Sequence, residues 1–290
     1  MKRNNSFSIF AAAAFCVAFY ISGIPLAGAG TPLWKFIAAG ASTAATASIL
    51  HLTNLRFGSK PGFFLPPIYI VLASANPNAL VFNVLHPVAL TLALSLFFGM
   101  RFFRCDLHQG DAFIAQMFLG LAGCFFPPAL WLAPLYFIAS LFRADDTARF
   151  FVASLAGLLL PVAAWTAVSY LLGGVQQAED FLVSVGSGAV AIGPKSIYYS
   201  AATIIRMLAV FVLTVVAIVN LRKTVLIVFI TGVCLVSLLF FDNSSEPMCL
   251  LTSLAAALPL SNFLYGNTSP RRRIFVALIL FLLIAERLTF

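Results

Sequence analysis

The feature that most constrains this chain is a series of long apolar runs, most of them near the length of a membrane span. A helix that crosses a hydrocarbon core of about 30 Å needs about 20 residues. The runs are continuous and do not alternate with a period of two, which favours helices over a β-barrel. We therefore expect an all-α, polytopic bundle of about 10–11 spans. The runs cover 7–28, 34–52, 62–75, 79–100, 112–126, 129–142, 150–172, 199–219, 225–241, 249–265 and 274–289.

Composition supports a lipid environment. Hydrophobic residues make up 62% of the 290 positions and charged residues only 9%, and the first acidic residue is Asp106. A soluble domain carries about 25% charged residues. The net charge of +8 comes from short basic clusters between apolar runs, which is typical of topogenic charge and not of nucleic-acid binding. We expect a single integral membrane domain over 1–290, with the lipid bilayer as its surroundings.

Three of the runs are short for a span. Segments 62–75, 112–126 and 129–142 are either full helices that extend into their flanks or re-entrant half-helices buried in the bundle. Pro127-Pro128 and Asn76-Pro77-Asn78 indicate turns between neighbouring runs.

Basic residues predict the orientation. With a cytoplasmic N-terminus, the turns on the inside hold most of the lysines and arginines, as the positive-inside rule requires. This indicates a bacterial inner-membrane protein whose first run, 7–28, is either a cleaved signal peptide or, as its length favours, an uncleaved helix. The inside residues are Lys2, Arg3, Arg56, Lys60, Arg101, Arg104, Arg143, Arg149, Arg222, Lys223, Arg271, Arg272 and Arg273.

The one sizeable outside loop is 173–198. Its apolar middle predicts that it lies along the membrane surface, where it could form an interfacial helix. It carries Glu179, Asp180 and Lys195, and Arg206 follows about 10 Å into the next run. These four residues form a candidate site for a lipid headgroup or other anionic substrate, because a guanidinium binds phosphate through two parallel hydrogen bonds. The alternative is that Arg206 snorkels to the outer surface.

Asn83 and His86 form a second candidate. They are three residues apart in run 79–100 and would share a helix face beside Pro87. The pair either lines a polar cavity in the outer half of the bundle or bonds a neighbouring helix.

The predicted cytoplasmic turns are rich in charge. Asp111 is expected to cap the helix that follows it, and the acidic pair between two arginines is expected to form a salt-bridged turn. No metal site, cofactor motif or disulfide framework is indicated, and the cysteines are expected to be small packing residues. The charged residues of these turns are Arg101, Arg104, Asp111, Arg143, Asp145, Asp146 and Arg149.

The stretch from Arg101 to Trp165 orders a basic turn, a "GLAG" helix, a break, a second helix, a charged turn and a "GLLLP" helix. Together with NLRFGSKPGFFLPPIYIVLAS (54–74), it resembles an uncharacterised bacterial family of multi-pass inner-membrane proteins, a domain-of-unknown-function family. Members of that family are often labelled carotene oxygenases. That chemistry holds iron with four histidines, and this chain has only His51, His86 and His108.

A more distant likeness is to multi-spanning polyprenyl-phosphate glycosyltransferases, which place a catalytic carboxylate in the first external loop. The corresponding residues here, Ala29 to Leu33, include no acid. We therefore expect a non-enzymatic transport or assembly component of the cell envelope, with other envelope proteins as partners. The alternative is a membrane enzyme that acts on a lipid-linked substrate at the outer leaflet.

Overall fold

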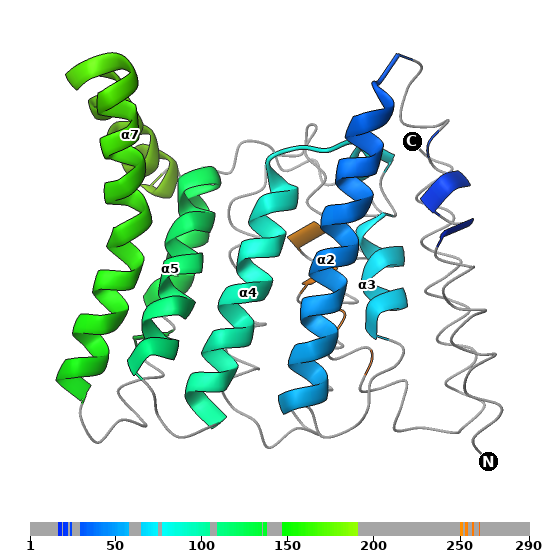
Figure 1. Ribbon diagram of the computed structural model, residues 1–290, viewed down its shortest axis with the longest axis horizontal. Coiled ribbons are helices and arrows are strands. Elements are labelled where there is room, and N and C mark those ends of the chain that lie inside the picture. Colours follow the sequence, from blue (N-terminus) through cyan, green and yellow to red (C-terminus); the bar gives the residue numbers. More distant parts are fainter. Residues whose placement is uncertain are drawn as a thin grey trace. The chain divides into compact units, whose positions relative to one another are not determined.

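The computed structural model describes residues 30–57, 65–74, 77–104, 109–134, 136–137 and 147–190, together with positions 17, 18, 20–22, 24, 250, 251, 253, 254, 257 and 261. Every element in this part of the chain is helical, and no strand occurs in it (Figure 1). The elements are α2 (Leu33–Phe57), α3 (Leu65–Ala73), the 3-10 helix η2 (Pro77–Leu80), α4 (Leu85–Arg104), α5 (Gln109–Phe125), the 3-10 helix η3 (Pro127–Leu132) and α7 (Thr147–Val190).

Within the described residues, three segments are long and apolar enough to cross a membrane: Leu33–Arg56, Leu85–Phe102 and Ala148–Ser187. The predicted all-α class is confirmed for this part of the chain, and these helices are compatible with a membrane protein. The total number of spans and the side of the N-terminus stay predictions. The expected runs 199–219, 225–241 and 274–289 lie outside the described residues.

The short predicted segments differ from one another in length. Helix α5 has 17 residues, which at 1.5 Å per residue is about 25 Å and close to the thickness of the hydrocarbon core. Helix α3 has nine residues, or about 13 Å, which is too short to cross by itself. Both predicted turns are occupied by 3-10 helices that begin at a proline, η2 at Pro77 and η3 at Pro127.

The contacts divide the chain into two compact units. In the first unit, α2 packs against α3, with Leu50, Leu65 and Tyr69 fully buried. The buried hydroxyls of Thr43 and Thr46 each donate to the carbonyl four residues earlier in α2. These bonds satisfy the two hydroxyls inside the helix, so both threonines can be buried without an unpaired donor.

In the second unit, α5 and α7 cross at glycines. A Cβ added to Gly120 would lie 2.3 Å from the Leu158 carbonyl oxygen, and one added to Gly157 would lie 2.2 Å from that of Phe113. The two backbones are therefore in direct contact, which is the packing that small residues permit between membrane helices. At Gly123, the space that a Cβ would occupy is filled by the side chain of Leu130 in η3.

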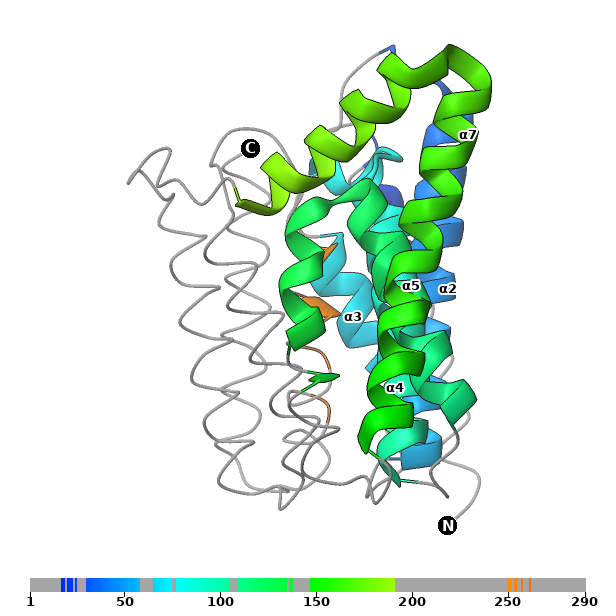
Figure 2. The same cartoon turned by 90° about the vertical axis from the view of Figure 1, so that its left-hand side faces the viewer.

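Helix α7 runs past the predicted outside end of its span. Its 44 residues are interrupted at Gly174, whose φ of 75° and ψ of −164° are not helical. A positive φ costs little only for glycine. The chain turns there and continues as a second helical arm, residues 175–190, which runs obliquely to the first (Figure 2). Residues 173–190, predicted as the first part of an outside loop, are therefore helical apart from this kink.

Candidate functional site

Asn83 and His86 lie in the first unit, and their geometry differs from the expected helix face. Helix α4 begins at Leu85, six residues later than the expected run. Asn83 lies before the helix, and its Oδ1 accepts the backbone N–H of Leu85 at 3.0 Å. Asparagine is favoured at such a position because its side chain satisfies a free donor of the first turn. The two residues therefore do not share a helix face.

His86 is almost completely buried, and both ring nitrogens have partners. Nε2 lies 3.1 Å from the carbonyl oxygen of Ala79, which can only accept, so Nε2 carries the proton. Nδ1 lies 3.2 Å from the backbone nitrogen of Asn83 and 3.0 Å from its Oδ1. The imidazole thus links η2 to the residues that lead into α4.

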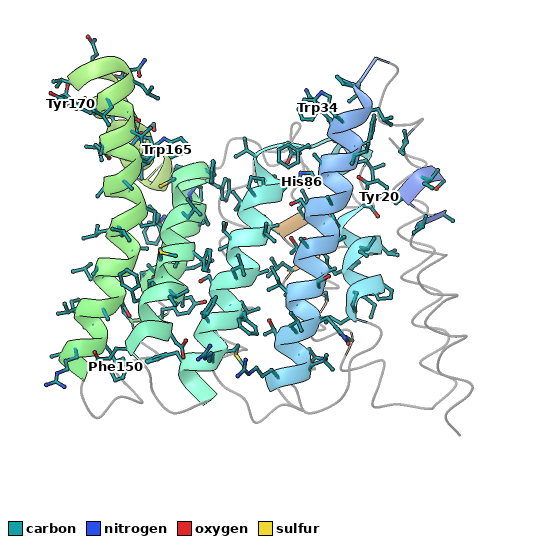
Figure 3. All side chains as sticks on the ribbon, in the orientation of Figure 1. Tyr20, Trp34, His86, Phe150, Trp165 and Tyr170 are labelled. Carbon is teal, nitrogen blue, oxygen red and sulfur yellow. The ribbon has the colours of Figure 1, made fainter. Side chains whose placement is uncertain are left out.

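The surrounding contacts close this turn against α2. The Ser42 hydroxyl donates to the His86 carbonyl at 3.3 Å, and the Phe82 N–H donates to the Lys35 carbonyl at 3.2 Å. The Phe82 ring stacks on the imidazole with the ring centroids 5.4 Å apart. Tyr20 donates to the carbonyl of Phe36 at 3.0 Å, and Figure 3 shows it with His86 and Trp34 near one end of the unit. Within the first unit, His86 thus has the geometry of a structural lock that holds η2 and the turn before α4 against α2.

The second unit has a charged end. Arg101, near the end of α4, places its Nε 3.1 Å from the Asp111 carboxylate in the first turn of α5. The Asp111 side chain is 6% exposed and that of Arg101 37%. Asp111 was expected as the helix cap, but α5 begins two residues earlier, and the carboxylate serves as a buried ion-pair partner near the positive end of the helix. Phe102 packs on Phe150 at the start of α7.

The opposite end of this unit is aromatic. Phe125, the last residue of α5, packs against Trp165 of α7, and Trp165 packs in turn against Phe181 of the second arm. In Figure 3, Phe150 lies at one end of α7, and Trp165 and Tyr170 lie toward the other. Helices α4, α5 and α7 thus share one charged end, and α5 and α7 meet at the aromatic end.

Gln116 of α5 is a buried polar group that sequence reasoning missed. It is 1% exposed, and among the described residues neither its amide oxygen nor its amide nitrogen has a hydrogen-bond partner. It precedes Gly120 by one helical turn and Gly123 by two, so it lies on the face that contacts α7 and η3. The available signal was a single amide in an otherwise apolar run, 112–126.

The candidates on and beyond α7 are only partly described. Glu179 and Asp180 are exposed on the second arm, and Arg149 is exposed in the first turn of the first arm. Arg104 ends α4. Arg143, Asp145, Asp146, Lys195 and Arg206 lie outside the described residues, so the predicted grouping of Arg206 and Lys195 with the two acids stays a prediction.

Metal-ligating side chains do not gather in groups of three or more anywhere in the described part of the chain. Comparison with known proteins found no matching family model, no matching curated protein and no matching solved structure.

Proposed function

We propose that this chain is a polytopic protein of the bacterial inner membrane that acts as a non-enzymatic transport or assembly component, and that transport of a polar solute is its role. The membrane assignment is supported by α7, the longest apolar segment described, which leaves broad apolar surface uncovered. Leu171 and Leu172 are each 80% exposed. Side chains of this type at this exposure are stable against lipid and costly against water.

The second unit has a charged end and an aromatic end, and this difference supports the predicted orientation in the membrane. Arg101 and Arg149 belong to the charged end, and Trp165 belongs to the aromatic end. Cytoplasmic turns of membrane proteins are enriched in Lys and Arg, and Trp is enriched at the interfaces. The charged end is therefore proposed to face the cytoplasm and the aromatic end the outside.

The observation that carries the transport proposal is the unpaired amide of Gln116. Leaving a buried amide without partners costs about 1–3 kcal/mol, and an apolar side chain of similar size would avoid that cost. A solute with hydrogen-bonding groups would satisfy the amide when it binds. Gln116 also lies beside the glycine contacts of α5 with α7. Helices that touch through backbone can slide by small shear movements, as alternating exposure of a site requires.

The test is a comparison of solutes inside proteoliposomes. Vesicles with and without the purified chain are loaded with a defined mixture of amino acids, sugars, nucleosides and small carboxylates, and lumen and medium are measured by mass spectrometry over time. We expect at least one solute class to leave the lumen with its mass unchanged. Gln116→Leu should abolish this flux while its thermal stability equals or exceeds that of the unaltered chain.

Gln176→Leu is the matched control, because it makes the same change at an exposed position of α7 and should retain the flux. If no solute class leaves the vesicles faster than from protein-free vesicles, the transport proposal is wrong. Release of a chemically altered compound would instead support the alternative of a membrane enzyme.

A further inference from the structure

The second arm of α7, residues 175–190, has two chemically distinct faces. At 100° per residue, the apolar side chains of residues 175–187 fall within an arc of about 120°, and the polar side chains share the opposite arc with a single apolar exception, Val183. The apolar arc contains Val175, Ala178, Phe181, Leu182 and Val185, and the polar arc contains Gln176, Gln177, Glu179, Asp180, Ser184 and Ser187.

Only part of the apolar face is covered by the chain itself. Ala178 and Val185 are buried, and the ring of Phe181 lies against Trp165 with the centroids 6.4 Å apart. Val175 and Leu182, on the neighbouring edge of the same face, are 66% and 47% exposed. The arm therefore rests on its own unit along one side of its apolar face and leaves the other side uncovered.

The position of the arm indicates what covers this remaining surface. It begins at the Gly174 kink, directly after residues that are apolar enough to cross a membrane. Tyr170, one turn before the kink, is 55% exposed, and exposed Tyr and Trp are typical of the depth of the headgroups. A helix with separate apolar and polar faces is stable in the interface plane, with its apolar face about 5–10 Å into the headgroup and acyl boundary.

We propose that residues 175–190 form an interfacial helix that lies in the outer surface of the bilayer. Val175 and Leu182 are embedded among the lipids, while Glu179 and Asp180 face water. The occupant of the uncovered apolar face is therefore phospholipid. This inference requires membrane insertion of α7 and is independent of solute transport, so loss of flux in the Gln116→Leu chain does not bear on it.

The test compares two neighbouring apolar residues that lie on different faces of the helix. Leu182 is on the apolar arc, whereas Val183 is 100° away among the polar residues and is 64% exposed. Leu182→Cys and Val183→Cys are made in a full-length chain whose five cysteines are replaced by alanine. Each is spin-labelled and reconstituted in phosphatidylcholine vesicles. Collision rates are measured with oxygen, which concentrates in lipid, and with a water-soluble nickel chelate.

We expect the ratio of oxygen to nickel collisions to be several-fold higher at position 182 than at position 183. Labels placed singly along 175–187 should repeat this ratio with a period of about 3.6 residues, which keeps the test valid if one variant misfolds. Equal ratios at the two positions would place the arm in water, and low collision rates with both reagents at position 182 would place a protein partner on it. Either result overturns the proposal.

Discussion

The crossing of α5 and α7 predicts opposite effects for the same substitution at two positions of one helix. At Gly120, an added Cβ would lie 2.3 Å from the Leu158 carbonyl oxygen, while ordinary contact begins at 3.4 Å. The alanine methyl therefore fits only if α7 moves away. At Gly110, nothing lies within 4 Å of the added atom, so Gly110→Ala needs no such movement. Both variants gain helix propensity.

The magnitudes follow from these distances. Gly to Ala in a helix contributes up to about 1 kcal/mol of stability. Separating α5 from α7 by about 1 Å forfeits a quarter to a half of the dispersion energy at each affected atom pair, and overpacking of this kind costs about 1–3 kcal/mol. We expect Gly120→Ala to be less stable than the unaltered chain by about 1–2 kcal/mol. Gly110→Ala should be equal to the unaltered chain or more stable.

The assay is unfolding of the purified chain in a single detergent, followed by tryptophan fluorescence. Gly157→Ala, on the α7 side of the same contact, should resemble Gly120→Ala. The double variant should cost less than the sum of the two, because one separation of the helices relieves both clashes. If Gly120→Ala is as stable as Gly110→Ala, the backbone contact between the two helices does not exist as described.

Three further predictions concern the polar contacts. Asn83→Ala should destabilise the chain by about 1 kcal/mol through loss of the cap, and Asn83→Ser should restore most of that stability in the same unfolding assay. His86→Phe keeps the ring but leaves the Ala79 carbonyl without its imidazole donor, so we expect a loss of about 1–3 kcal/mol; unchanged stability would contradict the structural lock. Arg101→Gln should be more damaging than Asp111→Asn, because it leaves a buried carboxylate unpaired while Asp111→Asn leaves a half-exposed guanidinium. Equal losses would mean that the carboxylate is hydrated.

Apolar run length predicted the helices better than it predicted their ends. The run 34–52 corresponds to α2, but the helix continues beyond the apolar stretch, through Leu55 and Arg56, and ends at Phe57. The start of the run 79–100 was placed six residues too early, because residues 79–84 are apolar enough for a span but form part of η2 and the Asn83 cap. Hydropathy responds to burial and does not distinguish a packed turn from a helix.

The candidate site residues show the same limit. The sequence identified Asn83 and His86 as costly polar residues at one place, but it could not show that the Leu85 N–H satisfies the first side chain and the Ala79 carbonyl the second. Gln116 has no unusual neighbour in the sequence, and its importance comes from the absence of a partner within its own unit. The helical part of 173–198 was visible as an apolar stretch, but the Gly174 kink that directs it depends on a backbone angle.

The central claim, that α7 crosses the membrane with its charged end in the cytoplasm, is tested most directly by the sidedness of its two ends. Ala148 and Gln176 are both exposed and lie at the start of the first arm and the start of the second. Ala148→Cys and Gln176→Cys, in the chain without its own cysteines, are labelled in intact bacterial spheroplasts with a membrane-impermeant maleimide. We expect Gln176→Cys to be labelled at once and Ala148→Cys only after the membrane is disrupted. Labelling of both positions from the same side, or of Ala148→Cys alone in intact spheroplasts, would contradict the account.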